Sequence, residues 1–181
     1  MPDTTQTTKK QKRSLLQIVL TTGLLASLST SLISYINSSF LETFLPKNWV
    51  GIVFSVAYAV TFLVIQNYAL IIRKFKNHNV APIVFALEIV ALLTLAANVH
   101  WFISLLAFIL LVVCYNVIVI NYDIFIEQLS THQNEGRIRG LFWTASNLGF
   151  LLGALMTGVL SAKYGFSAAY LIAGLLLIPV W

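Results

Sequence analysis

Long apolar runs alternate with short polar stretches along this chain of 181 residues. A helix needs about 20 apolar residues to cross the hydrocarbon core of a bilayer. Because lipid offers no hydrogen-bond partner to an unpaired backbone group, each run is expected to be a helix. The pattern predicts an all-α integral membrane protein with six transmembrane helices. The expected spans are residues 15–36, 49–72, 80–97, 102–124, 140–162 and 166–181.

The two ends of this bundle differ. Residues 1–14 form a basic tail ahead of the first apolar run. A signal peptide also begins this way, but its apolar region is shorter than the run at 15–36, so we expect an uncleaved first helix. The last run stops at Trp181 without a polar exit. We therefore expect residues 15–181 to be a six-span bundle truncated at its C-terminus.

The basic residues predict the orientation. Lys and Arg number eleven, with four in the tail, three after the second span and two before the fifth. These nine fall on one side of the membrane, and only Lys47 and Lys163 fall on the other. Since cytoplasmic loops are rich in Lys and Arg, we expect both the N-terminus and the end of the sixth span to be cytoplasmic.

The composition narrows the function. Hydrophobic residues make up 59% of the chain and charged residues 9%, with a mean hydropathy of +0.87. A soluble domain has roughly 45–50% apolar and about 25% charged residues, so a soluble enzyme, a disordered tail and a fibrous protein are excluded. The net charge of +5 is explained by basic residues in the cytoplasmic loops and does not indicate nucleic-acid binding. The expected partner is the lipid bilayer.

The sequence carries no recognisable catalytic or metal-binding pattern. It lacks GxSxG, HExxH and P-loop motifs. The single cysteine, Cys114, lies in an apolar run, while His78, His100 and His132 share no ligand spacing. We therefore expect neither enzymatic activity nor a metal or other cofactor.

A stripe of small and polar residues follows one face of the first span, because its members recur at steps of three and four residues. Two interpretations stay open. The stripe either allows close helix packing or forms the wall of a water-filled cavity that binds a solute. The polar residues concerned are Ser27, Thr30, Ser31, Ser34 and Asn37.

The fourth span places Asn116, Asp123 and Glu127 on one face, at i, i+7 and i+11. Asn116 joins the cavity candidates. The two carboxylates repel each other and lie near a helix C-terminus, where anions are disfavoured. A salt-bridge network at the inner gate is the preferred interpretation, with direct participation in proton or substrate movement as the alternative. The expected cations are Arg73, Lys74, Lys76, Arg137 and Arg139.

Glu88 lies in the middle of the third span. A charged group at this depth costs at least about 2.5–3.5 kcal/mol. Glu88 is therefore a proton- or ion-coupling residue, a carboxylate paired with a cation on a segment outside this sequence, or a neutral acid that bonds to a neighbouring helix.

In the fifth span, Ala145, Gly149 and Gly153 form a small face on which another helix can pack closely.

The segment from Glu135 to Tyr170 resembles the major facilitator superfamily, in the passage from the loop between the fourth and fifth helices into the sixth. The resemblance implies the N-terminal six-helix half of a twelve-helix transporter, built as a 3+3 inverted repeat. It also implies that the first and fourth helices line the cavity, and that the second and fifth face the partner half. The matching residues are Arg139–Gly140, Gly149, Gly153, Gly158, Leu160, Gly165–Phe166 and Tyr170.

Two motifs depart from the family pattern. The signature G-x-x-x-D-R-x-G-R-[RK] after the second helix is nearly lost, with Arg73 in place of Asp and Lys76 in place of Gly. The Gly-Pro pair of antiporters is Gly153–Ala154 here, which argues against drug antiport.

These features together predict secondary-active transport of a small solute by alternating access, in a multi-pass protein of a bacterial-type plasma membrane. Transport would need a second six-helix half, supplied by a C-terminal continuation or by a homodimer partner. The alternative is a non-transporting or degenerate membrane assembly module.

Overall fold

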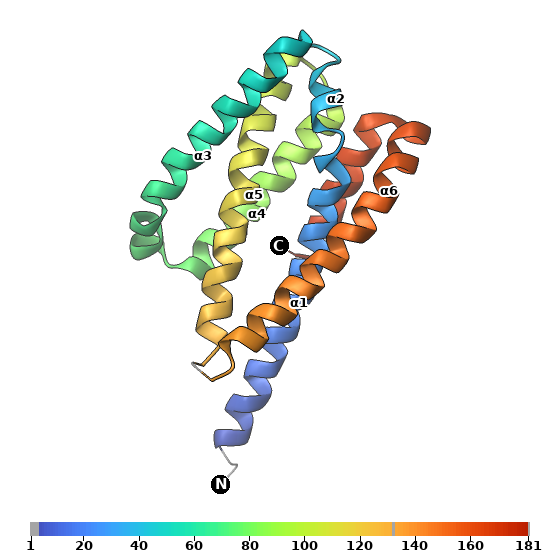
Figure 1. The fold of residues 1–181 in the computed structure, drawn as a ribbon. Coiled ribbons are helices and arrows are strands. Elements are labelled where there is room, and N and C mark those ends of the chain that lie inside the picture. The colour runs from blue at the N-terminus through green and yellow to red at the C-terminus, as the bar shows by residue number, and fades with distance from the viewer. Residues whose placement is uncertain (1–3, 132, 181) are drawn as a thin grey trace.

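The computed structural model describes residues 4–131 and 133–180, with side chains from residue 12 onward (Figure 1). Its described elements are all helices, which confirms the all-helical fold. They are α1 (Thr4–Ser34), α2 (Asn37–Leu41), α3 (Lys47–Phe75), α4 (Asn77–Ala97), α5 (Trp101–Leu129) and α6 (Glu135–Leu177). Five of these helices are long and apolar enough to cross a membrane, α2 being the exception.

Gly165 divides α6 into two arms. Its φ of 80° and ψ of 175° are not helical, and this conformation is essentially restricted to glycine because a Cβ atom would clash. We refer to residues 135–164 as the first arm and to residues 166–177 as the second arm. The chain reverses at the bend, and the second arm returns along the bundle (Figure 1).

The helices extend beyond the apolar runs. α1 begins at Thr4, within the polar tail, and α2 lies in the polar stretch between the first two runs. One residue, Lys76, separates α3 from α4. The helix ends and the apolar boundaries differ because a helix satisfies its backbone in water as well as in lipid, whereas hydropathy marks only the part suited to lipid.

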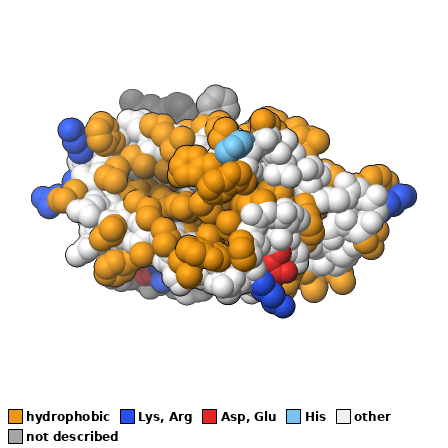
Figure 2. All heavy atoms as spheres, turned by 90° about the horizontal axis from the view of Figure 1, so that it is seen from above, with side chains coloured by type: hydrophobic (Ala, Val, Ile, Leu, Met, Phe, Trp, Pro, Cys, Tyr) orange, Lys and Arg blue, Asp and Glu red, His pale blue; other side chains and the backbone are white. Residues whose placement is uncertain are grey.

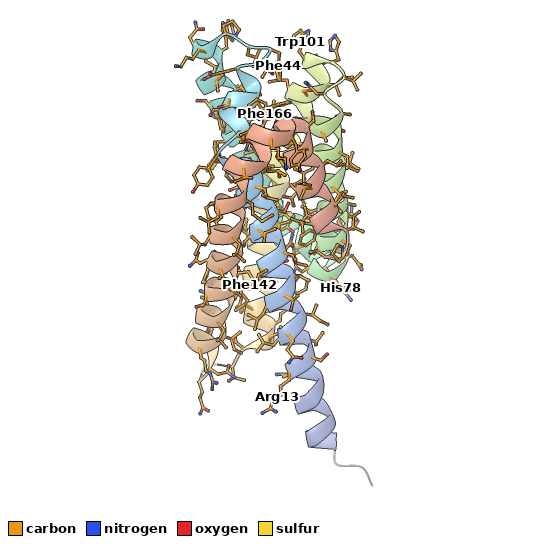
Figure 3. All side chains as sticks on the ribbon, turned by 90° about the vertical axis from the view of Figure 1, so that its right-hand side faces the viewer. Arg13, Phe44, His78, Trp101, Phe142 and Phe166 are labelled. Atoms are coloured by element: carbon orange, nitrogen blue, oxygen red, sulfur yellow. The ribbon has the colours of Figure 1, made fainter. Side chains whose placement is uncertain are left out.

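The basic segments gather toward one end of the bundle. The start of α1, the α3–α4 connection and the α5–α6 connection lie toward this end, and α2 and the α4–α5 connection lie toward the other (Figure 1). Figure 3 shows Arg13 and His78 toward the first end, with Phe44 and Trp101 at the second. The arrangement therefore keeps the segments rich in Lys and Arg together.

Apolar side chains cover much of the outer surface. Figure 2 views the bundle from above and shows hydrophobic side chains across the middle of this end, with Lys and Arg side chains at its edges. Phe62 and Leu63 of α3 are 66% and 59% exposed, and Leu155 and Val159 of α6 are 68% and 69% exposed. Exposure on this scale suits a surface covered by lipid or by another protein, in agreement with an integral multi-pass membrane protein.

The small face of α6 packs against α1 of the same chain. A Cβ atom added to Gly149 would strike the backbone carbonyl of Leu24, and one added to Gly153 would come within 2.6 Å of the Leu28 carbonyl oxygen. The resemblance had implied that this face meets the partner half. The structure corrects that expectation, because α1 already fills the face. The spacing predicted a close contact but could not identify the contacting helix.

Hydroxyl groups reinforce the packing of α1 on both arms. Ser31 Oγ donates to the Phe150 carbonyl at 2.6 Å, and Ser29 Oγ donates to the Ala173 carbonyl at 2.9 Å. In addition, Tyr170 OH on the second arm donates to Asn37 Oδ1, at the start of α2, at 2.7 Å. Such bonds between helices stabilise membrane bundles by about 0.6 kcal/mol each on average.

Candidate functional site

Two cavities flank one buried carboxyl group inside the bundle. The first, of about 130 Å³, lies among α1, α4, α5 and the first arm of α6. The second, of about 140 Å³, lies among α1, α2, α3, α4 and α5. Thr30, Glu88 and Tyr115 line both cavities. The two cavities thus form one site around these three residues.

Glu88 reaches this site from α4. It is only 3% exposed, and in the described part of the chain its carboxyl group forms neither an ion pair nor a side-chain hydrogen bond. Buried carboxyl groups normally have hydrogen-bond or ionic partners because burial without them is costly. An unpartnered Glu88 at the edge of two cavities is therefore available to a proton or to a ligand.

The residues of the polar stripe lie in two settings, at the cavities and in the contact between helices. Ser27 lines the first cavity, Thr30 lines both, and Ser34 together with Asn37, at the start of α2, lines the second. Ser31, in contrast, is fully buried against the first arm of α6. One α-helix can present residues to both settings because residues one position apart point about 100° apart around its axis.

Asn116 does not line either cavity. Its Nδ2 donates to the Val112 carbonyl one turn earlier, at 2.8 Å. Other side chains on α5 and its neighbours line the site instead, and several of them are aromatic or carry a hydroxyl group. These are Tyr58, Tyr115, Tyr122, Trp143 and Ser146. The sequence pattern does not single them out, because an aromatic residue in an apolar run resembles any core or lipid-facing residue.

The expected inner-gate charges are not paired with one another. Among the described residues the one ion pair joins Arg139 to Glu135 on the same helix, with Nη2 and Oε1 3.4 Å apart. Asp123 is half-buried and Glu127 is exposed. The candidate cations Arg73, Lys74, Lys76, Arg137 and Arg139 are all exposed.

A neutral network instead joins α3, α4 and α5 near that end. Tyr68 OH donates to Asn121 Oδ1 at 2.6 Å, and Asn77 Nδ2 donates to the Asn121 carbonyl at 3.3 Å. All three residues are buried. Asn77 Oδ1 and Asn121 Nδ2 have no partner among the described atoms. The network is thus held together by amide and hydroxyl groups rather than by charges.

A double-mutant cycle tests which network holds this end together. We expect Tyr68→Phe and Asn121→Leu to show a coupling of about 0.6–1.7 kcal/mol in unfolding free energy, the range found for hydrogen bonds between membrane helices. The matched cycle of Asp123→Asn with Arg139→Gln should be additive in the isolated chain, because Arg139 pairs with Glu135. Unfolding in mixed micelles measures both cycles. Coupling in the charged pair alone would contradict this assignment.

No metal site is found in the described residues. His78 is exposed, and His100 caps α5 by accepting the Phe102 N–H at 3.2 Å. His132 lies outside the described residues, and Cys114 is buried. A wider groove of about 370 Å³ beside His78 is lined mainly by apolar side chains and holds no acidic group.

The fold and the site together define a multi-pass helical membrane protein with a small site inside its bundle, in which a few polar groups lie in a mostly apolar lining. The model of the Major Facilitator Superfamily matches residues 15–181, and the chain belongs to that superfamily. Membership implies membrane transport, since members of the family are generally transporters rather than enzymes. A comparison with curated proteins found no match.

Proposed function

We propose that this chain is the N-terminal half of a secondary-active transporter that moves a small solute by alternating access. The observation that carries this proposal is Glu88, a buried carboxyl group without a hydrogen-bond or ionic partner among the described residues, between two cavities that the polar stripe also lines. Intramembrane ionisable groups that face a cavity are typical of substrate, ion and proton pathways. Glu88 is the proposed proton- or ion-coupling residue, and Ser27, Thr30, Ser34 and Asn37 are the proposed solute contacts.

The proposal includes six membrane spans with a cytoplasmic N-terminus. α1, α3 and α4 would form one three-helix repeat, and α5 with the two arms of α6 would form the other. The bend at Gly165 supports six spans, because it reverses the chain within α6. The gathering of the basic segments at one end supports the orientation, through the preference of Lys and Arg for the cytoplasmic side.

The inner gate is proposed to form between this half and its partner. Asp123 and Glu127 would pair there with loop cations that are exposed in the isolated half, among them Arg73, Lys74, Arg137 and Arg139. The partner would be a second six-helix half, from a continuation of the chain or from a second copy. Since α1 covers the glycine face of α6, the partner half must contact other exposed surfaces of this chain. The proposed location of the transporter is a bacterial-type plasma membrane.

A non-transporting or degenerate assembly module is the second candidate function. The observation that favours it is the near loss of the family signature after the second helix, where Arg73 and Lys76 replace Asp and Gly. Flux measurements distinguish the two functions.

We expect residues 1–181 to carry no saturable flux as a monomer, since alternating access needs a second body to move against. The chain would be reconstituted in liposomes at dilutions where cross-linking shows monomers or dimers. Uptake of radiolabelled choline, glucose, alanine and lactate would be measured, so that each charge class is represented. Saturable uptake by the monomer would contradict the half-transporter. No uptake by the dimer, or by the chain joined to a second six-helix half, would favour the assembly module.

A further inference from the structure

We propose that the site around Glu88 binds a compact organic monocation, whose entry displaces a proton from the Glu88 carboxyl group. This inference rests on the proposed transport function and assigns a substrate class to it. It concerns a small onium or ammonium group rather than a large lipophilic drug, because the two cavities measure only about 130 and 140 Å³.

The charge of the lining selects the sign of the ligand. Glu88 is the one ionisable carboxyl group among the residues that line the two cavities, and these residues include no Lys, Arg or His. An anionic solute would meet a carboxyl group and no cation. A neutral solute would leave Glu88 unchanged. A cation stabilises the ionised form of a carboxyl group that lacks an ionic partner in the described chain more strongly than a neutral hydrogen-bond donor does.

The aromatic lining is suited to the same ligand. Tyr115 borders both cavities, Tyr58 borders the second, and Trp143 borders the first. The faces of aromatic rings attract ammonium groups, and sites for quaternary ammonium ligands commonly combine several such rings. A ring without a nearby carboxylate would serve an apolar solute equally well. The combination of both favours a cation.

One hydroxyl group is left for a polar substituent on the ligand. Ser146 Oγ is buried without a hydrogen-bond partner among the described atoms, and Ser146 lines the first cavity. A buried hydroxyl group without a partner is unusual. A ligand with a hydroxyl group two carbons from its ammonium centre could satisfy it, which makes choline a suitable probe.

The exchange step is balanced in charge and protons. A neutral carboxylic acid and a monocation give a carboxylate–cation pair and one free proton. The net charge of the site is therefore zero both before and after the cation binds. The other titratable groups near Glu88 are Tyr58, Tyr115, Tyr122 and Cys114. These are phenols and a thiol rather than bases, so Glu88 is the group that releases the proton. Affinity should therefore fall as the pH falls.

The test compares choline with 3,3-dimethyl-1-butanol, in which carbon replaces the charged nitrogen. Isothermal titration of the chain in lipid nanodiscs would give both affinities, and buffers of different ionisation enthalpy would give the number of protons released. We expect choline to bind at least about tenfold more tightly than its neutral isostere, with release of up to one proton. Glu88→Gln should remove this preference, while Glu42→Gln, the same change at an exposed position, should retain it.

Tyr115 provides a second variant that keeps Glu88 intact. Tyr115→Phe retains the ring and should keep most of the choline preference, whereas Tyr115→Leu should reduce it severalfold without changing the affinity of the neutral isostere. Equal binding of choline and its isostere, or a preference that survives in Glu88→Gln, would overturn the cation site. If choline binds but neither the dimer nor the joined halves show flux, the proposed transport function is rejected and the cation site is retained. If another solute shows saturable flux and choline does not bind, the cation site is rejected and the transport function is retained.

Discussion

Replacing Gly149 with alanine is expected to destabilise the chain by about 1–3 kcal/mol, the usual cost of adding a group to a filled interior. The new Cβ atom would strike the backbone carbonyl of Leu24. A backbone group cannot move aside by changing rotamer, so the first arm of α6 must separate from α1. The same separation would disturb the first cavity, because α1 and this arm both line it. Unfolding in mixed micelles, followed by far-UV circular dichroism, measures the loss.

Gly158→Ala is the matched control for this prediction. Gly158 lies in the same arm, and a Cβ atom added there meets nothing within 4 Å. Since alanine favours a helix over glycine by up to about 1 kcal/mol, this control should leave stability unchanged or raise it. Equal losses at positions 149 and 158 would show that the close α1–α6 packing is not what makes Gly149 sensitive.

The spacing of small residues predicted a close helix contact but not its partner. Gly149 and Gly153 are four residues apart, and this spacing indicates only that one face of the helix lacks side chains at these positions. Whether α1 or a helix of another half fills the face depends on the three-dimensional path of the chain. The break expected between the spans 140–162 and 166–181 falls at the bend, although the sequence does not reveal the φ angle of Gly165.

Glu88 could be singled out from the sequence, because a carboxyl group inside an apolar run is costly wherever the helix packs. Its surroundings could not be predicted. Thr30, Tyr58 and Tyr115 come from three different helices, and their meeting at Glu88 depends on how those helices rotate against one another. A single sequence therefore identifies the carboxyl group of the site but not the aromatic residues that surround it.

At the end of the bundle where the basic segments gather, the charged residues were easier to select from the sequence than the residues that form contacts. Asp123 and Glu127 stand out in an apolar sequence, and for that reason a charge network was expected around them. Neutral amides stand out less, yet Asn121 and Asn77 are buried between helices. Long charged side chains at a helix end reach solvent at little cost, so they need no partner within this chain.

Lys76→Gly is expected to stabilise the chain by about 1–2 kcal/mol. Lys76 joins α3 to α4 with φ 61° and ψ 145°, a conformation that costs a residue with a Cβ atom about 1–3 kcal/mol. Glycine removes this strain, although its more flexible unfolded chain offsets about 0.4–1 kcal/mol of the gain. The residue falls where the resembled family signature has glycine, so the lost motif and the strained backbone coincide at one position. Thermal unfolding of the purified chain measures the change.

Two further variants separate backbone strain from charge. Lys76→Ala removes the ammonium group but keeps a Cβ atom, so it should give none of the stabilisation. Asn98→Gly changes the other described non-glycine residue with positive φ, at 43°, where asparagine is already tolerated and little gain is expected. A gain in Lys76→Ala equal to that in Lys76→Gly would assign the effect to repulsion among the loop cations. A gain in Lys76→Gly alone would assign it to the α3–α4 turn, and that variant would be the better starting protein for the binding measurements at Glu88.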